Sequence, residues 1–279
     1  FRRPMLADTL PAHIISTGVS VDVLSTHATR ILGPLLGGIF LAYLDESYIT
    51  FFLFCLYFLS LLCVLTQRDT TTFKKQEGNF FNSFSRVLSE TRKNINLLTV
   101  ILLTFIFNIF SLPFIALIGI LLIEKFQKEA LEIGLLTSLE GVGALLGGSL
   151  IAAFPPKNKR IMFTIFLAII LGSMISSAVT NNLIVYLVCI IAFGFSAACY
   201  SALQSTIIYL NSLPELRSPT FSLLTIAIGC GSLGSLNIYI MSKKLTTELI
   251  TIIIGCEGIL MLIFTLFFIN FISTSTKEN

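Results

Sequence analysis

Apolar runs fill most of the chain and are separated by short polar stretches. Eight of these runs reach roughly 20 residues, the length that a helix needs to cross about 30 Å of hydrocarbon. They cover residues 14–42, 49–65, 95–123, 131–154, 161–179, 183–210, 221–241 and 249–272. Because the runs are continuous and lack the alternation of barrel strands, the pattern predicts an all-α, polytopic membrane protein with eight transmembrane helices.

One long polar interval divides these spans into two before it and six after it. Within it, FFNSFSRVLSETRKN spaces apolar residues at a helical period, which favours a polar linker helix or a helix lying on the membrane surface. The sequence predicts four parts: the end of an N-terminal half (1–66), a cytoplasmic linker (67–94), a six-helix C-terminal half (95–273) and a cytoplasmic tail (274–279). Since many transporters have two six-helix halves, we expect four more helices upstream.

Composition supports a membrane protein, and the distribution of charge indicates its orientation. Hydrophobic residues make up 55% of the chain, charged residues 12%, and the mean hydropathy is +0.91, whereas a soluble domain carries about 25% charged residues. Positively charged loops stay in the cytoplasm, and thirteen Lys and Arg fall in one set of connections against four in the other. We therefore expect both ends in the cytoplasm. The net charge of +3 reflects this topology, so nucleic-acid binding is not expected.

Catalytic chemistry has little support in the sequence. The chain has two histidines, and none of the common nucleophile, zinc-protease or phosphate-binding motifs occurs in it. The six cysteines fall inside apolar spans and form no CxxC pair, which favours buried thiols over a metal site or a disulfide framework. We expect neither an enzyme nor a cofactor.

Two spans carry a similar glycine pattern, RILGPLLGGIFLA at 30–42 and EGVGALLGGSLIA at 140–152. Each places two glycines four residues apart on one helix face, which lets a neighbouring backbone approach closely. Pro34 lacks a backbone donor and bends or kinks its helix. The residues of this conformational motif are Gly33, Pro34, Gly37, Gly38, Gly143 and Gly147.

These motifs, read with the order of the spans, resemble the major facilitator superfamily, in the bacterial branch of siderophore exporters and macrolide efflux pumps. GPLLGG is similar to the superfamily's antiporter motif on helix five, with Thr29 where a further glycine is usual. FPPKNKR is similar to the basic loop between helices eight and nine, without its usual acidic residue. LPELRSPTFS is similar to the loop between helices ten and eleven, where Arg217 matches and Ser218 and Pro219 replace the usual Gly-Arg.

The resemblance implies that the eight spans match helices five to twelve of a twelve-helix bundle. It implies secondary transport by a monomer in the bacterial inner membrane, with the lipid bilayer, a small-molecule substrate and protons as partners. It also implies that the bend at Pro34 seals the outward path during export; a plain packing kink is the alternative.

Ionisable residues inside a membrane are costly and usually mark pathways, partners or proton relays. Asp22 shares a polar, small-residue face with Gly33 and Gly37, and Arg30 borders that face. Arg30 is expected to face the cavity or to pair with Glu140; binding to backbone carbonyls is the alternative. Glu140 lies beside the second glycine face and is therefore a better candidate for proton exchange than Glu257.

Uncharged polar residues provide candidate contacts for a ligand. Asn108 lies close to Pro113, and Tyr200 and Gln204 share a face of their span. They suit a moderately bulky amphipathic substrate, while hydrogen bonds between helices are the structural alternative.

Taken together with these residues, the resemblance implies a proton-coupled exporter of a small amphipathic molecule such as a drug, a macrolide or a siderophore. Two alternatives stay open. One is a truncated remnant that does not transport, and the other is a lysophospholipid transporter of the same superfamily.

Overall fold

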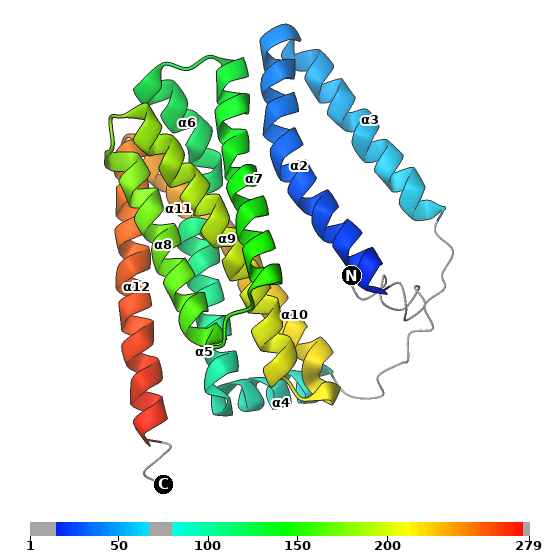
Figure 1. The fold of residues 1–279 in the computed structure, drawn as a ribbon, viewed down its shortest axis with the longest axis vertical. Helices are drawn as coiled ribbons and strands as arrows, with labels where there is room; N and C mark the ends of the chain where they lie inside the picture. Colours follow the sequence, from blue (N-terminus) through cyan, green and yellow to red (C-terminus); the bar gives the residue numbers. More distant parts are fainter. Residues whose placement is uncertain (1–14, 67–79, 276–279) are drawn as a thin grey trace. The chain divides into compact units, whose positions relative to one another are not determined.

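The computed structural model describes the backbone of residues 15–66 and 80–275, and the side chains of 28–66, 85–213 and 215–271. Every regular element in this part of the chain is a helix, which confirms the all-α fold (Figure 1). The helices are α2 (Ile15–Tyr43), α3 (Glu46–Leu65), α4 (Phe80–Lys93), α5 (Ile95–Ile106), η1 (Phe107–Ser111), α6 (Phe114–Phe126), α7 (Ala130–Ala153), α8 (Lys159–Val179), α9 (Leu183–Asn211), η2 (Pro214–Leu216), α10 (Arg217–Gly229), α11 (Gly231–Ser242) and α12 (Thr247–Ser275).

Seven of the expected spans are confirmed as helices long and apolar enough to cross a membrane, counted over the described residues. Two of the seven consist of successive helical segments, Ile95–Phe126 and Arg217–Ser242. The eighth expected span is α2, whose fully described part, Ala28–Tyr43, is an apolar helix of less than spanning length.

Local capping explains where several helices begin and end. The side-chain oxygen of Asn94 accepts hydrogen bonds from the N–H groups of Asn96 (3.0 Å) and Leu97 (3.4 Å), which starts α5. Asn182 does the same for Ile184 and Val185 at the start of α9. Helix α6 ends at Gln127, which adopts the left-handed conformation with φ 50°.

The chain divides into two compact units. The first comprises residues 1–77 and 128–138, and therefore contains α2, α3 and the start of α7. Gly38 is buried there and packs closely against α7. A methyl group built on it would lie only 2.7 Å from the Cα of Gly134. No side chain of α3 is buried within the described residues, so this helix is free to present its apolar surface to lipid.

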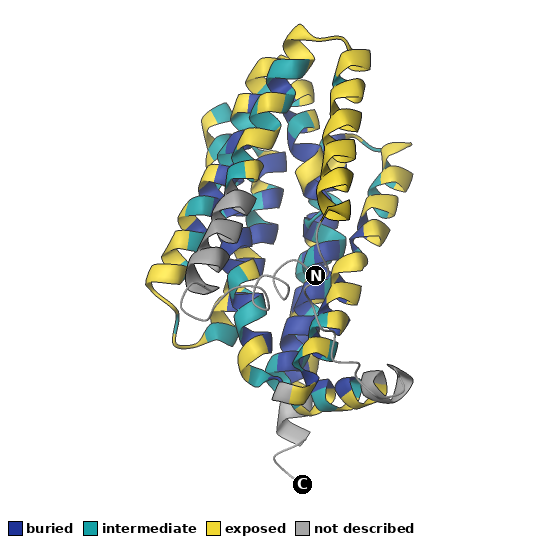
Figure 2. Ribbon diagram, turned by 90° about the vertical axis from the view of Figure 1, so that its right-hand side faces the viewer, coloured by how far each residue is buried: buried dark blue, intermediate teal, exposed yellow. Residues whose placement is uncertain are grey.

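The second unit comprises residues 78–127 and 139–279. Its buried positions lie mainly on α5, α8 and α9, facing one another inside the bundle, while exposed positions face outward (Figure 2). Large buried side chains such as Phe163, Phe193 and Leu167 fill this core. Tyr186 of α9 also donates a hydrogen bond to the carbonyl of Ile118 on α6 (2.8 Å).

Helix α4 lies across one end of this bundle (Figure 1), which confirms the helix predicted in the linker. Val87 is buried, whereas Arg86 is exposed and lies 3.8 Å from Glu215. Asn96 follows on α5 and donates to the side-chain oxygen of Asn211 (2.8 Å). The connection between α9 and α10 is therefore held against α4 and the start of α5. The location of α4 at a membrane surface stays a prediction.

Candidate functional site

A groove with a volume of about 570 Å³ lies in the second unit, between the η1–α6 junction and the α10–α11 junction. It is lined by Leu112, Pro113, Ile115, Ala116, Ile228, Gly229, Gly231, Ser232 and Ser235. Two serines are the polar members of this lining, and none of its residues is charged. Ligand sites are typically mostly apolar clefts of about 300–1,000 Å³ with a few polar groups. The groove therefore suits an uncharged, largely apolar molecule.

Both spans that border the groove are interrupted beside it. In Ile95–Phe126, the π-helix η1 interrupts the α-helix, and the N–H of Leu112 donates to the carbonyl of Phe107, five residues earlier (2.9 Å). Pro113 follows and has no N–H to continue the ladder. In Arg217–Ser242, α10 and α11 meet at Cys230. π-Helices are frequent at functional sites, and transporters commonly bind ligands where helices are broken.

Glycines bring the backbone of α11 directly against η1. A methyl group on Gly231 would lie 3.4 Å from the carbonyl oxygen of Asn108 and 3.2 Å from a side-chain carbon of Leu112. On Gly234 it would clash with the carbonyl oxygen of Ile109 and lie 2.8 Å from the ring of Pro113. This contact was not predicted from the sequence, although the three-residue spacing of the two glycines was a signal for it.

Two of the predicted substrate residues belong to a buried hydrogen-bond network that joins α5, η1 and α9. The amide of Gln204 donates to the hydroxyl of Thr104 (2.6 Å), and the amide of Asn108 donates to the carbonyl of Thr104 (2.9 Å). Asn108 and Gln204 are 3% and 7% exposed. In this conformation the two side chains therefore form hydrogen bonds within the bundle, which was the alternative to substrate binding. Contact with a substrate stays a prediction.

Tyr200, the third predicted substrate residue, is also buried. Its ring stacks on Phe107 of η1 with centroids 4.9 Å apart, and on Phe163 of α8 at 4.1 Å. Neither Tyr200 nor the Asn108 and Gln204 side chains line the groove. The aromatic stack therefore holds η1 in place behind the groove.

The glycines of α7 make the close helix contact that the sequence predicts. A methyl group on Gly143 would clash with the carbonyl of Ile191, and one on Gly147 would clash with the carbonyl of Phe195, both on α9. Gly194 receives the backbone carbonyl of Glu140 in the same way. The side chain of Glu140 is therefore held, 7% exposed, at the α7–α9 interface. Roles in conformational change and proton exchange stay predictions.

The other glycine pair, Gly33 and Gly37, makes no close contact among the described residues, so its role in helix packing stays a prediction. Methyl groups on Gly33 or Gly37 would meet no heavy atom within 4 Å among the described residues. The close contact lies on the neighbouring face, where Gly38 meets Gly134 and where a methyl group on Gly134 would lie 2.6 Å from the carbonyl oxygen of Pro34. Gly134 was missed because nothing in its local sequence marks it as a contact.

The predicted ionisable residues of α2 are only partly described. Arg30 is half-buried, and the side chain of Asp22 lies outside the described residues. Arg30 belongs to the first unit and Glu140 to the second, so their pairing stays a prediction.

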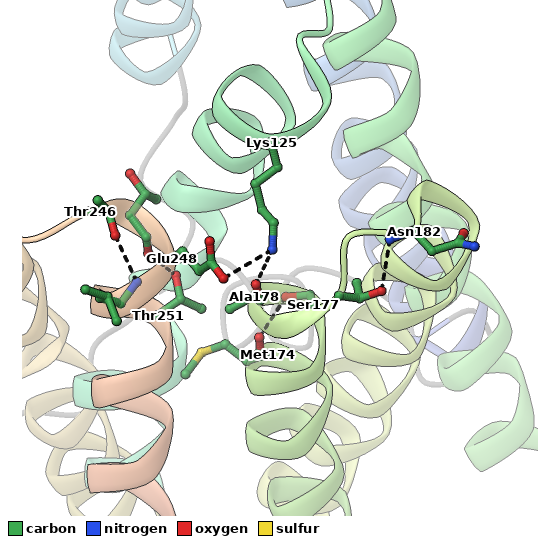
Figure 3. A network of polar contacts seen from close by, with 11 residues as sticks. Lys125, Met174, Ser177, Ala178, Asn182, Thr246, Glu248 and Thr251 are labelled. Carbon is green, nitrogen blue, oxygen red and sulfur yellow. Dashed lines mark hydrogen bonds and ion pairs between the residues drawn. The ribbon is translucent and has the colours of Figure 1, made fainter.

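A polar cluster at the ends of α6, α8 and α12 was also missed. Lys125 donates to the carbonyl of Ala178 and lies 3.6 Å from the carboxylate of Glu248 (Figure 3). Its side chain is only 8% exposed. The hydroxyl of Ser177 donates to the carbonyl of Met174 beside it (2.7 Å). A lysine near a helix C-terminus interacts favourably with the last carbonyls, so this cluster ties three helix ends together.

Comparisons with known proteins agree with this architecture. A comparison with curated protein sequences found no match. Among solved structures, the chain is similar to a bacterial homologue of the human lysosomal transporter Spinster, which was solved in an inward-facing, unoccupied conformation. The two share 15% sequence identity with a TM-score of 0.61, over 98% of this chain and 72% of the other. At this identity the likeness shows the fold.

The sequence profile of the family described as transmembrane secretion effector matches residues 3–278, nearly the whole chain. The chain therefore belongs to the transmembrane secretion effector family of major facilitator superfamily transporters, and is a multi-pass membrane protein.

Proposed function

We propose that the protein is a proton-coupled secondary transporter that exports small amphipathic molecules, as siderophore and drug exporters do. The observation that carries this proposal is the groove at the two helix breaks. Its volume of about 570 Å³ and its apolar lining with Ser232 and Ser235 suit the uncharged part of such a substrate. Glu140 is proposed as the residue that exchanges protons because it is a nearly buried carboxylate in a membrane span.

The experiment measures dye transport by the full protein in proteoliposomes under an imposed pH gradient. Nile red serves as an uncharged amphipathic probe, and ethidium serves as a permanently charged one. We expect Nile red to move against its gradient and the movement to stop when nigericin collapses the pH gradient. Absence of gradient-driven movement of either probe by folded protein would refute the proposal.

Ala116 allows a test of the groove itself. Its side chain lines the groove and is exposed, so Ala116→Trp should block Nile red transport without disturbing the core. Ala168→Trp is the matched control because Ala168 is also exposed, on α8, and does not line the groove. Equal transport by the two variants would place the substrate elsewhere.

Proton coupling has its own matched pair. We expect Glu140→Gln to abolish the response to the pH gradient, whereas Glu257→Gln, on the half-buried carboxylate of α12, should leave it in place. Competition with a labelled lysophospholipid separates the lipid alternative: transport of the lysophospholipid without transport of either dye would favour that substrate.

A further inference from the structure

Five buried hydroxyls in the second unit have no hydrogen-bond partner among the described residues, those of Thr91, Ser111, Ser196, Tyr200 and Ser212. Two of them belong to serines inside the bundle, Ser111 at the end of η1 and Ser196 on α9. They are 0% and 1% exposed. Other buried hydroxyls of this unit donate to a carbonyl in the preceding turn: Thr104 to Val100, Ser177 to Met174 and Thr251 to Thr247. An unpaired buried hydroxyl is costly because it has lost its bonds to water. The two serines are therefore exceptions that need an explanation.

Two aromatic pairs indicate that Ser111 and Ser196 lie at the same height along the interface between residues 107–114 and α9. Phe107 stacks on Tyr200 with centroids 4.9 Å apart, and Phe114 packs on Phe193 at 5.1 Å. Ser111 lies four residues after Phe107 and three before Phe114, and Ser196 lies three residues after Phe193 and four before Tyr200. Residues three or four apart share a helix face, so the two hydroxyls lie between the same two aromatic pairs.

Ser111 lies within the π-helix. A serine in a helix can donate to the carbonyl four residues earlier, which for Ser111 is that of Phe107. In η1 this carbonyl accepts the N–H of Leu112, five residues later (2.9 Å), and the Ser111 hydroxyl does not donate to it. The next two residues, Leu112 and Pro113, line the groove, so Ser111 lies directly behind its wall.

The two spans that carry these hydroxyls are uncharged, since neither 95–123 nor 183–211 contains an aspartate, glutamate, lysine, arginine or histidine. The charged residue that packs on α9 near Ser196 is Glu140 of α7, whose backbone meets Gly194. The two spans themselves therefore offer a partner hydrogen bonds and no charge.

We propose that Ser111 and Ser196 form a neutral hydrogen-bonding subsite that opens when η1 separates from α9 during the transport cycle. The subsite binds an uncharged polar group of the transported molecule, such as a carbonyl, hydroxyl or amide, while the apolar part lies in the groove. This inference rests on the proposed transport function. It explains why two polar side chains are kept at positions where alanine would avoid the cost of desolvation.

The test compares Ser111→Ala and Ser196→Ala with Ser177→Ala, which removes an equally buried hydroxyl that is already bonded. Transport of Nile red, which carries a carbonyl, is compared with transport of diphenylhexatriene, a hydrocarbon without hydrogen-bonding groups. We expect the first two variants to raise the KM for Nile red about fivefold, the equivalent of one hydrogen bond, with an unchanged KM for diphenylhexatriene. Their thermal stability should be equal to that of the wild type or higher. Ser177→Ala should lower stability and leave both KM values unchanged.

Several outcomes would overturn the subsite. An unchanged KM for Nile red in both serine variants is one. A fall in kcat for both probes alike is another, because it would mean that the hydroxyls act in a step of the transport cycle that does not depend on the substrate. Ser196→Cys keeps the side-chain size with a weaker hydrogen bond, and should give an intermediate KM even if the alanine variant folds poorly. If the wild-type protein moves neither probe, the proposed function fails first, which is distinguishable from failure of the subsite.

Discussion

Gln204 of α9 donates its side-chain amide to the hydroxyl of Thr104 on α5 across 2.6 Å, although the two residues are 100 positions apart in the sequence. Thr104 also donates to the carbonyl of Val100 (2.7 Å), so its hydroxyl is both a donor and an acceptor. Thr104 is fully buried and Gln204 is 7% exposed. The bond therefore joins two core helices where little water is available to compete.

Replacing Gln204 with leucine should lower the free energy of unfolding by about 1 kcal/mol, the scale of hydrogen bonds between membrane helices. Thr104→Val should cost a similar amount, and the double variant should cost less than the sum of the two because both lose the same bond. The chain has no tryptophan, so the measurement is the folded fraction of a fluorescent-protein fusion after heating. Strict additivity would show that the bond contributes nothing.

Glycine at position 147 is expected to be essential for packing. Gly147→Ala places a methyl group against the backbone carbonyl of Phe195, and should cost about 1–3 kcal/mol of stability. Gly172→Ala is the matched control in the same unit because a methyl group there meets no described heavy atom within 4 Å. If both variants melt at the same temperature, α7 and α9 do not pack as closely as the structure shows.

Lys125 should matter more than an ordinary surface lysine. Lys125→Met removes the partner of both Glu248 and the Ala178 carbonyl, and should cost about 1–2 kcal/mol, since Glu248 keeps partial access to solvent. Lys128→Met is the control because Lys128 lies 2.7 Å from Glu132 in a more exposed pair, which should contribute less to stability than the Lys125 pair. A smaller loss for Lys125→Met than for Lys128→Met would contradict this.

The helical architecture could be predicted from the sequence because it depends on local composition. Runs of aliphatic and aromatic residues form helices in a bilayer wherever the polar backbone must be satisfied internally. The helix in the linker could be predicted in the same way, because the spacing of its apolar residues is a local feature of the sequence. Pro113 signals a discontinuity, yet it does not distinguish a kink from a π-helix such as η1, which depends on the glycines of α11 and the rings of Tyr200 and Phe163 packing around it.

The contacts of the site depend on tertiary packing, and the sequence shows them only in part. Gly143 and Gly147 could be predicted as a contact face because both glycines lie on one helix, but their partners Ile191 and Phe195 carry no mark in the sequence. The Lys125–Glu248 pair joins residues more than a hundred positions apart, and each looks like an ordinary helix-end charge. The groove likewise forms where two interrupted spans meet.

Exchange of the charges of Arg30 and Glu140 tests the pairing predicted from the sequence. Arg30→Glu and Glu140→Arg should each lower gradient-driven Nile red transport more than tenfold, because each leaves two like charges within the membrane. The double variant should recover part of the activity if the two residues pair in some state of the cycle. Arg30→Lys keeps the charge but loses the planar donor set of the guanidinium, and should retain transport if Arg30 acts through charge alone. Failure of the double variant to recover any activity, with Arg30→Lys inactive as well, would instead indicate that Arg30 binds backbone carbonyls and that Glu140 acts without it.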